Sequence, residues 1–403
     1  MTARRTSLLL VAGVLLLSLN LRPAAVSVGP VLDEVRDAFG MSGATAGLLT
    51  SLPVLAFAFF GALAPTAARR VGVHRVTLVA LLAVGGGLLG RAVTGSETLF
   101  LLLSLVALAG MAMANVLLPS LVKLHFPDRI GAMTAAYTTA LAVGLTASLA
   151  LTVPVAEAAG GWRTGLGLWA LLALLAALPW LGLVAHDRRP DDGTERRAIR
   201  YAEVARTPLG IAMAVFFGLQ SLQAYAVFGW FAQLWRDSGW SATAAGLLVA
   251  LIAGVSIPLS LWLPRLLASR EHPIGVLLAV IACYPVGYGG MLLTPASLAP
   301  LWALLVGTAA CTFPLILTLV GLRARTPEGT AALSAFTQSA GYLLAAAGPF
   351  AIGIVHDATG GWDWPVALLL VLSLPLAGLA AYVARPQAVE DQLDRRPVAR
   401  VTS

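Results

Sequence analysis

Charged residues are scarce in this chain of 403 residues: only 11% are Asp, Glu, Lys or Arg, whereas 59% are hydrophobic. A soluble globular protein carries about 25% charged residues, so the composition excludes an ordinary soluble fold. The apolar residues lie in long runs, and about 20 such residues span a bilayer. Because the runs are continuous rather than alternating, they predict membrane-spanning helices and exclude a β-barrel.

Residues and motifs that carry chemistry are also scarce. The two cysteines, Cys283 and Cys311, both lie in apolar runs and form neither a metal-binding nor a disulfide spacing. The five histidines lie in loops or at the ends of apolar runs, and the chain has no glycine–lysine loop for phosphate. We therefore expect no metal, no cofactor, no use of ATP and no enzyme activity. A receptor or scaffold would need larger soluble extensions than these loops provide.

The net charge of +7 does not indicate nucleic-acid binding, because the basic residues lie in short connections between apolar runs. Most of them fall at the chain ends and in every second connection. The opposite connections carry only Arg36, Arg91, Arg163 and Arg236. By the positive-inside rule, this asymmetry predicts a multi-pass protein of the bacterial inner membrane with both termini in the cytoplasm.

Run length and flanking charge predict twelve transmembrane helices. They cover residues 7–33, 44–68, 74–93, 98–121, 130–155, 163–184, 208–234, 242–264, 274–293, 299–321, 329–354 and 364–384. The polar stretch 185–207 predicts a cytoplasmic linker between an N-terminal six-helix bundle over 1–184 and a C-terminal six-helix bundle over 208–384, and residues 385–403 a cytoplasmic tail. The predicted fold class is an all-α membrane protein.

The two halves repeat each other about 200 residues apart. "SGATAGLLTSL" at Ser42 recurs as "SATAAGLLVAL" at Ser241, and "GGW" recurs at Trp162 and Trp362. "FPDRIGAMTAAYTTA" likewise corresponds to "TPEGTAALSAFTQSA". A parallel repeat of this kind predicts two pseudo-symmetric bundles with a substrate site between them, near the bilayer midplane.

The strongest candidate for that site is Arg22, within "LNLRPAAVSVGPVL". It lies about fifteen residues, or roughly 22 Å, into the first span, and intramembrane charges mark functional sites by default. Asn20 is predicted to point to another helix face, although Pro23 can relax that geometry. Pro23 and Pro30 predict kinks in this helix, and a gating role for them stays open.

Other polar residues within the predicted spans are candidates for lining the substrate site. They are Asn115, Tyr137, Thr138, Gln220, Gln223, Gln338 and Tyr342. Gln220 and Gln223 share one helix face, as do Gln338 and Tyr342, which favours cavity lining. Asn115 could equally form an interhelical hydrogen bond, and the threonine could bond back to its own helix.

No Asp or Glu lies near the middle of any predicted span. Proton-driven carriers commonly relay protons through intramembrane acids. A relay or gate here would have to use Asp33, Glu34, His356 or Asp357, near the outer ends of their spans. Coupling to protons therefore stays open.

The chain resembles the major facilitator superfamily and, within it, the cyanate / 2-nitroimidazole transporter group. The resemblance rests on "LNLRPAAVSVGPVL", "GLLTSLPVLAFAFFGALAP", "NVLLPSLVKLHFPDRIGAMTAAYTTAL", "GWRTGLGLWALLALLA", "FFGLQSLQAYAVFGWF" and the stretch from "LTLVGLRARTPEGT" to "HDATGGW". It implies alternating access and a small anionic or polar substrate. A proton-coupled multidrug-type exporter and an uncoupled facilitator of another small organic solute remain alternatives. We expect a monomer whose partners are a small-molecule substrate and membrane lipid.

Overall fold

The computed structural model describes residues 3–184, 201–270 and 273–393. These residues form helices and no strand, and twelve helical segments are long and apolar enough to cross a membrane. The predicted all-α membrane fold of twelve spans is confirmed. Helix α9 illustrates the surface: it exposes Leu171, Leu178 and Leu181, each more than half accessible, as expected for a face covered by lipid rather than water.

The N-terminal half comprises the elements up to α9, which pack mainly on one another. Their bounds are α1 Ala3–Asn20, α2 Pro23–Val26, η1 Gly29–Val31, α3 Leu32–Phe39, α4 Gly43–Ala56, η2 Phe57–Gly61, α5 Ala62–Val71, α6 Val73–Val93, α7 Glu97–His125, η3 Pro127–Arg129, α8 Ile130–Ala158 and α9 Trp162–Leu183.

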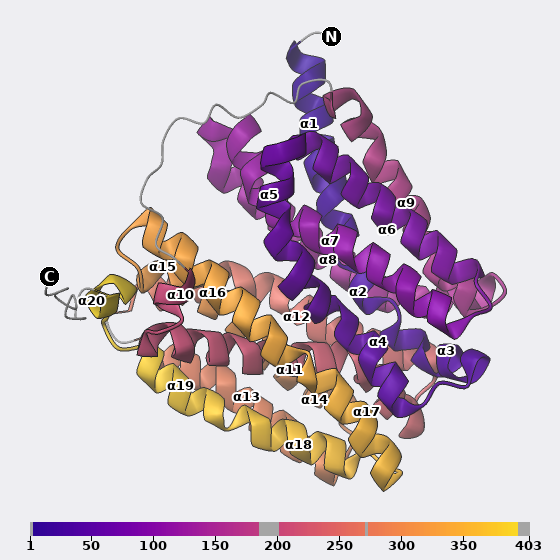
Figure 1. Cartoon of the computed structure of the whole chain (residues 1–403). Coiled ribbons are helices and arrows are strands. Elements are labelled where there is room, and N and C mark those ends of the chain that lie inside the picture. Colours follow the sequence, from indigo (N-terminus) through magenta and orange to yellow (C-terminus); the bar gives the residue numbers. More distant parts are fainter. Residues whose placement is uncertain (1–2, 185–200, 271–272, 394–403) are drawn as a thin grey trace, which may run out of the picture.

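The C-terminal half comprises the elements from α11 to α19, with a short helix on either side. Their bounds are α10 Tyr201–Val204, α11 Pro208–Asp237, α12 Ala242–Ala268, α13 Ile274–Leu293, α14 Ala299–Ala310, α15 Thr312–Leu322, α16 Pro327–Ala345, α17 Ala347–Thr359, α18 Asp363–Ser373, α19 Pro375–Val383 and α20 Val389–Leu393. Figure 1 shows the two halves as neighbouring helical groups.

The sequence repeat is visible in how equivalent helices begin. The hydroxyl of Ser42 accepts the backbone N–H of Thr45 at 3.1 Å, at the start of α4. The hydroxyl of Ser241 accepts the backbone N–H of Ala244 at 3.2 Å, at the start of α12. Both serines satisfy a helix N–H that lacks a partner within its helix, so the repeated motif encodes the same local structure twice.

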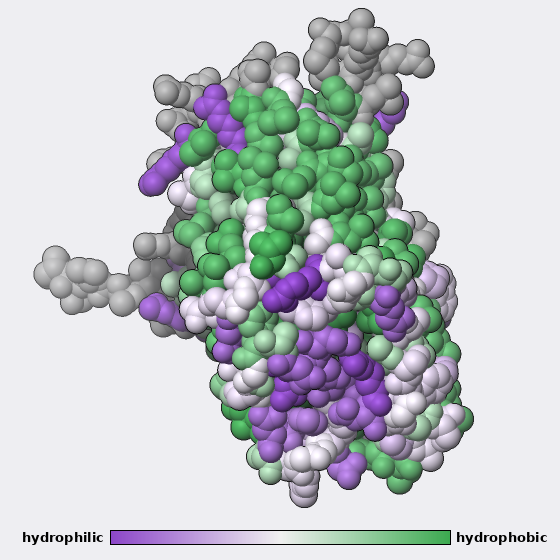
Figure 2. All heavy atoms as spheres, turned by 90° about the vertical axis from the view of Figure 1, so that its right-hand side faces the viewer, coloured by the Kyte–Doolittle hydropathy of each residue, from purple (hydrophilic) through white to green (hydrophobic). Residues whose placement is uncertain are grey.

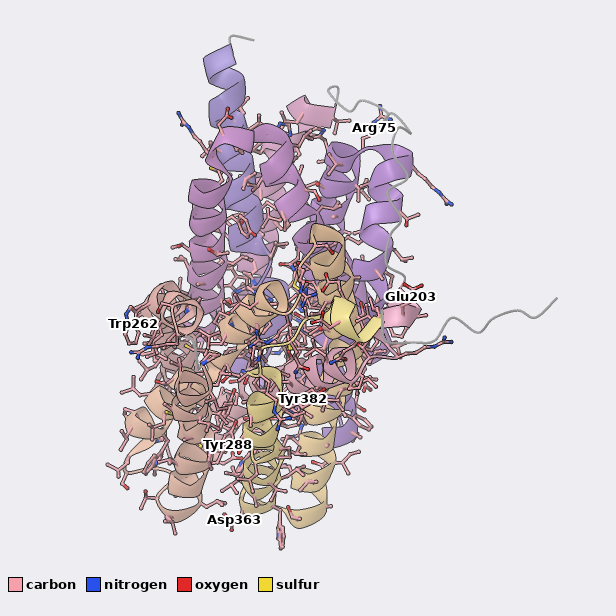
Figure 3. All side chains as sticks on the ribbon, turned by 90° about the vertical axis from the view of Figure 1, so that its left-hand side faces the viewer. Arg75, Glu203, Trp262, Tyr288, Asp363 and Tyr382 are labelled. Atoms are coloured by element: carbon pink, nitrogen blue, oxygen red, sulfur yellow. The ribbon has the colours of Figure 1, made fainter. Side chains whose placement is uncertain are left out.

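The molecule has two ends, which we call the termini end and the α3 end. The start of α1 and the end of α19 lie at the termini end, and α3 lies at the other (Figure 1). Figure 2 views the α3 end and shows a cluster of hydrophilic residues bordered by hydrophobic ones. Figure 3 views the termini end, with Arg75 on the N-terminal half and Tyr382 on the C-terminal half.

The halves touch through α4 with α17, α8 with α12, η1 with α11 and η2 with α16. Glycines permit two of these close approaches: a Cβ on Gly29 would overlap the carbonyl oxygen of Phe228, and one on Gly47 would lie 2.9 Å from the Cα of Phe350. The inter-half contacts lie between mid-span and the α3 end, so the molecule is closed at that end.

The first span, predicted over 7–33 with kinks at Pro23 and Pro30, is longer and more divided than predicted. Its apolar stretch runs over Leu9–Phe39 but is divided into α1, α2, η1 and α3. Pro23 begins α2 and Pro30 lies within η1, so both prolines lie at interruptions of the helix. The physical reason is the missing N–H of proline, which removes a hydrogen bond from the helix before it.

Candidate substrate site

Arg22 lies at the first interruption of the first span. Helix α1 ends at Asn20, and the carbonyl of Arg22 accepts the backbone N–H groups of Ala25 and Val26 at 3.0 and 3.2 Å. Arg22 is thus the residue from which α2 begins, directly before Pro23. The break turns a half-buried guanidinium away from a regular helix and toward the facing half.

The guanidinium of Arg22 lies beside the phenol of Tyr225 on α11 and within electrostatic reach of Tyr342 on α16. The rings of Tyr225 and Tyr342 meet edge to face, with centroids 6.4 Å apart. Tyr342 also stacks on Phe57 of η2 at 5.1 Å. No ion pair joins Arg22 to an acidic side chain in the part of the chain that the structure describes. Arg22 and Tyr342, both predicted site residues, are therefore neighbours across the two halves.

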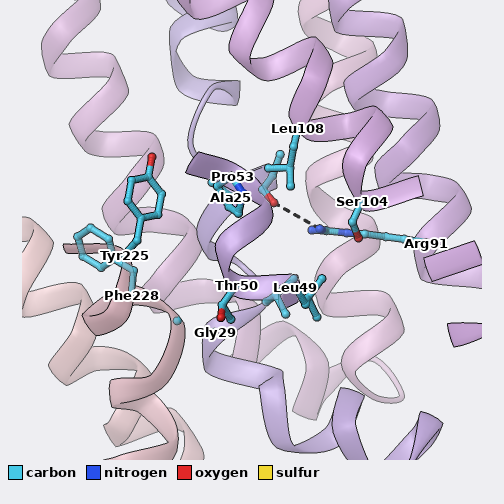
Figure 4. A pocket seen from close by; sticks show the side chains of 13 residues that line it. Ala25, Gly29, Leu49, Thr50, Pro53, Arg91, Ser104, Leu108, Tyr225 and Phe228 are labelled. Atoms are coloured by element: carbon cyan, nitrogen blue, oxygen red, sulfur yellow. Dashed lines mark hydrogen bonds between the residues drawn. The ribbon is translucent and has the colours of Figure 1, made fainter. Parts of the chain in front are cut away.

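A cavity lies next to this cluster, between the halves (Figure 4). Its lining comes from the interrupted first span, α4, α6, α7 and α11. The polar groups that line it are Thr50, Arg91, Ser104 and Tyr225. Its volume is about 10 Å³, which is room for about one water molecule. In this conformation the cavity is too small for an organic solute.

Arg91 and Ser104 are site residues that the sequence did not predict. Arg91 lies near the end of its apolar run, where it resembles the arginines of the loops. The structure buries it to 1% exposure in α6, where it donates to the carbonyl of Ala24 at 3.3 Å and to the hydroxyl of Ser27 at 3.0 Å. One feature of the sequence could have indicated this burial: the apolar stretch "GLLGRAV" continues past Arg91.

Asn20 occupies a structural position rather than the cavity. Its side chain is 1% exposed, and its amide donates to the carbonyls of Leu16 at 2.8 Å and Leu172 at 3.1 Å. The second bond ties α1 to α9. The predicted difference in direction between Asn20 and Arg22 is therefore present.

Gln220 and Gln223 differ from the predicted cavity lining. Both are 0% exposed inside the C-terminal half. Gln220 donates to the hydroxyl of Tyr284 at 3.0 Å, and Gln223 donates to the carbonyl of Leu369 and accepts from the hydroxyl of Tyr288 at 2.8 Å. The two glutamines do share a face of α11, but that face points into their own bundle (Figure 3 labels Tyr288 there). Buried amides need such partners, so they link helices of one half.

The remaining predicted lining residues are dispersed over three helices. Asn115 is half-buried in α7; on α8, Tyr137 is half-buried and Thr138 is exposed. On α16, the amide of Gln338 donates to the hydroxyl of Ser334 at 2.9 Å, one turn earlier in the same helix. Gln338 and Tyr342 lie one turn apart on α16, as predicted, but only Tyr342 contacts the cluster around Arg22.

The acidic residues predicted for coupling or gating meet at the α3 end, in a set of contacts that we call the latch. Arg236 of the C-terminal half pairs with Glu34 at 2.9 Å and Asp33 at 3.4 Å, both on α3. A second ion pair has its positive charge on the N-terminal half: Arg36 of α3 pairs with Asp357 of α17 at 3.3 Å. The latch thus ties the halves together with charges of both signs.

Asp357 makes a further contact across the halves. Its carboxylate accepts the backbone N–H of Gly43, the first residue of α4, at 2.5 Å. A carboxylate at this position complements the positive end of the helix dipole. His356 lies alongside, with Nδ1 3.7 Å from Asp357 and its ring 4.4 Å from that of Trp362.

Within the described ranges, no group of three or more His, Cys, Asp and Glu side chains is placed to hold a metal ion. The polar groups around the contact of the two halves include two guanidinium groups, phenols and hydroxyls. This chemistry can bind an anion or a polar solute by charge and hydrogen bonds.

A bundle of twelve spans with such a site between its halves defines a secondary solute transporter of the membrane. The chain belongs to the Major Facilitator Superfamily, whose sequence model matches residues 8–349. It is not an enzyme; its relatives are transport proteins.

Two relatives come from Escherichia coli (strain K12). The chain is 35% identical to a 2-nitroimidazole transporter over 94% of this chain and 96% of the relative. It is 28% identical to the cyanate transport protein CynX over 90% of this chain and 94% of the relative. The predicted resemblance to this group is confirmed.

The fold is also similar to that of a solved transporter. A bacterial homologue of the human lysosomal transporter Spinster superposes with a TM-score of 0.79, covering 96% of this chain and 98% of the other. The two sequences are only 16% identical, so this likeness bears on the fold alone.

Proposed function

We propose that this transporter moves a small anionic or polar solute, of the cyanate or nitroimidazole type, by alternating access. The observation that carries the proposal is Arg22: a half-buried guanidinium at a helix break, beside tyrosines of the facing half, with no carboxylate partner among the described residues. A partly buried charge without a counter-charge is unfavourable. An anionic or electron-rich solute would relieve that penalty.

In this proposal Arg22 supplies the charge, and Tyr225 and Tyr342 supply hydroxyls and aromatic walls. All three lie where the halves meet, so a rocking motion of one half against the other changes their separation. The names of the relatives support the choice of solute: one is a 2-nitroimidazole transporter and another a cyanate transport protein. Asn115, Tyr137, Thr138 and Gln338 would join the lining only if the halves shift.

We propose further that the protein works as a monomer in a bacterial inner membrane, with both termini in the cytoplasm and residues 185–207 linking two six-helix bundles. The excess of arginine in the termini-end connections supports this orientation. The closed α3 end then faces outward, and the latch of Asp33, Glu34, Asp357 and their arginine partners is an outer gate. Pro23 and Pro30 let the first span bend around the site.

Counterflow in proteoliposomes tests the proposal. Vesicles loaded with unlabelled cyanate or 2-nitroimidazole should accumulate the labelled solute transiently, whereas protein-free vesicles should not. Repeating the assay with a pH gradient separates a proton-coupled carrier from an uncoupled one, because only the former concentrates solute against its gradient. Exchange of neither solute would reject the proposed substrate class.

A further inference from the structure

Arg91 is a second intramembrane guanidinium with unusual surroundings. It is 1% exposed, and its two acceptors, the carbonyl of Ala24 and the hydroxyl of Ser27, are both neutral. Its Nε is buried and has no hydrogen-bond partner. No acidic side chain of the described residues pairs with it. A whole positive charge is thus buried with neutral acceptors but no counter-charge, which is unfavourable in a low-dielectric interior.

A second unpartnered polar group faces the same cavity. Ser104 of α7 is 0% exposed and lines the cavity together with Arg91. Its hydroxyl has no hydrogen-bond partner. The hydroxyl of Thr50 on the same cavity already bonds to the carbonyls of Ala46 and Gly47, at 3.0 and 3.1 Å. The Nε of Arg91 and the hydroxyl of Ser104 are therefore donors that no group of the described residues accepts, and both residues lie at the cavity (Figure 4).

We propose that a halide ion of the size of chloride binds in this cavity between Arg91 and Ser104. An anion rather than a water molecule balances the charge of the guanidinium, and the serine hydroxyl donates a hydrogen bond to it. The volume of about 10 Å³ holds one particle near the size of a water molecule, which excludes phosphate and organic carboxylates. A monovalent anion would neutralise the single positive charge of the Arg91 guanidinium.

This site differs from the one around Arg22, although Tyr225 borders both: it lines the cavity and lies beside Arg22. Both hydrogen bonds of Arg91 lie within the N-terminal half, to Ala24 and Ser27. The bound anion would thus neutralise the α2–α6 contact and hold a negative charge close to the substrate site. The inference does not depend on which solute is transported.

The test is the thermal stability of the purified full-length protein in detergent, in sodium chloride, sodium cyanate and sodium gluconate at equal ionic strength. Wild type should show a saturable rise in melting temperature with chloride relative to gluconate, and a response to cyanate should not depend on Arg91. Arg91→Gln should lose the rise with chloride. Arg163→Gln is the matched control, because Arg163 also donates to a backbone carbonyl, that of Thr94 at 3.0 Å, but does not line the cavity. It should keep the response.

Ser104→Ala provides a second variant in case Arg91→Gln does not fold. Removing one hydrogen bond should raise the chloride midpoint about two- to tenfold. Arg22→Gln should keep the chloride response.

Three results would overturn the inference. The first is identical wild-type melting in all three salts, and the second is an unchanged chloride midpoint in both Arg91→Gln and Ser104→Ala. The third is a response to cyanate alone that disappears in Arg22→Gln, which would assign anion binding to Arg22. None of these melting-temperature measurements requires transport, so they can succeed or fail independently of the counterflow assay.

Discussion

Arg22 and Arg91 show how the surroundings of single residues set their roles. Arg22 faces Tyr225 and Tyr342 of the other half, so its environment must change if the halves rock. Arg91 is anchored to Ala24 and Ser27 of its own half and would keep its contacts. Arg22 is therefore suited to a binding site that opens and closes as the halves move. Arg91 is suited to a binding site that persists in every conformation.

Tyr225→Phe tests the polar wall beside Arg22. The change removes a hydroxyl and leaves the ring, so the protein should fold and its kcat should change little. A hydrogen bond to a charged group contributes about 1.5–3 kcal/mol, so we expect the KM for exchange of an anionic substrate to rise by roughly tenfold or more. Tyr382→Phe is the control, because that tyrosine lies on the last span, at the termini end. Equal KM values in wild type and Tyr225→Phe would remove this hydroxyl from the site.

Single residues also show what the sequence can predict. A charge inside an apolar run is visible without a structure, and Arg22 stands out in that way. Helical spacing correctly gives Gln220 and Gln223 a shared face, but it cannot say toward which neighbour the face turns, because that depends on the packing of distant helices. Arg91 escapes prediction because its position near the end of a run resembles a loop, whereas tertiary contacts bury it.

At the scale of elements, the first span is a chain of short helices rather than one rod. The prolines make the interruptions predictable, since the missing N–H weakens the helix at each. The close crossing of η1 and α11 is not predictable, because it requires Gly29 to meet Phe228, two residues that are remote in sequence.

Gly29→Ala tests that crossing. The added Cβ would overlap the carbonyl oxygen of Phe228, and overpacking of this kind costs about 1–3 kcal/mol. We expect a lower melting temperature in detergent and a less closed α3 end. The matched control is Gly86→Ala on α6, where a Cβ meets nothing within 4 Å and alanine favours the helix by about 1 kcal/mol. If Gly29→Ala melts no lower than Gly86→Ala, the crossing is not tight.

At the scale of the whole molecule, the latch holds the closed α3 end. Asp357→Ala removes the pair with Arg36 and the bond to the N–H of Gly43. The hydrogen bond from an N–H to a carboxylate contributes about 1.5–3 kcal/mol and the partly exposed ion pair up to about 1 kcal/mol, so the open population should rise about tenfold or more.

The reporter for this prediction is Thr50→Cys, in a background with Cys283 and Cys311 replaced by alanine. Thr50 is only 6% exposed and lines the cavity, so a thiol reagent should label it faster from the α3 end when the latch is broken. Asp363→Ala is the control, because Asp363 is an exposed acid at the start of α18 that forms no part of the latch. Equal labelling rates in both variants would contradict a gating role.

The termini end has its own clasp, formed by α20. Glu390 accepts the backbone N–H groups of Arg325 and Thr326, both at 3.0 Å, at the start of α16. Gln392 accepts the backbone N–H of Leu209 at 3.0 Å, at the start of α11. Partial burial opposes ionisation of Glu390, but the hydrogen bonds from its own backbone, Thr326 and Arg325 outweigh it and lower the pKa of this carboxyl.

A depressed pKa predicts how the stability of this clasp depends on pH. The ionised carboxylate stabilises the folded protein fully above the pKa of an unfolded glutamate, about 4.3, and this contribution disappears as the pH falls through the lower folded value. Glu390→Gln should therefore melt below wild type at pH 7, and the difference should vanish in acid. Asp363→Asn serves as the control. A difference between wild type and Glu390→Gln that stays constant with pH would rule out the charged clasp.

The overall architecture is the most predictable level. Long apolar runs require helices in lipid, and the repeated segments around Ser42 and Ser241 require two similar halves. The conformation is not predictable, because it depends on contacts such as Arg236 with Glu34 and Arg36 with Asp357, which join positions more than 200 residues apart. The local sequence shows that Asp33, Glu34 and Asp357 are charged, but not which distant arginine each of them pairs with.

The central claim is that Arg22 binds the transported solute, and cyanate counterflow tests it most directly. Wild type, Arg22→Ala and Arg22→Lys should be reconstituted at equal amounts after size exclusion and melting confirm that each is folded. Arg22→Ala should abolish exchange. Arg22→Lys should restore it only in part, because an ammonium lacks the planar donor fork of the guanidinium. Exchange by Arg22→Ala at the wild-type rate would contradict the account.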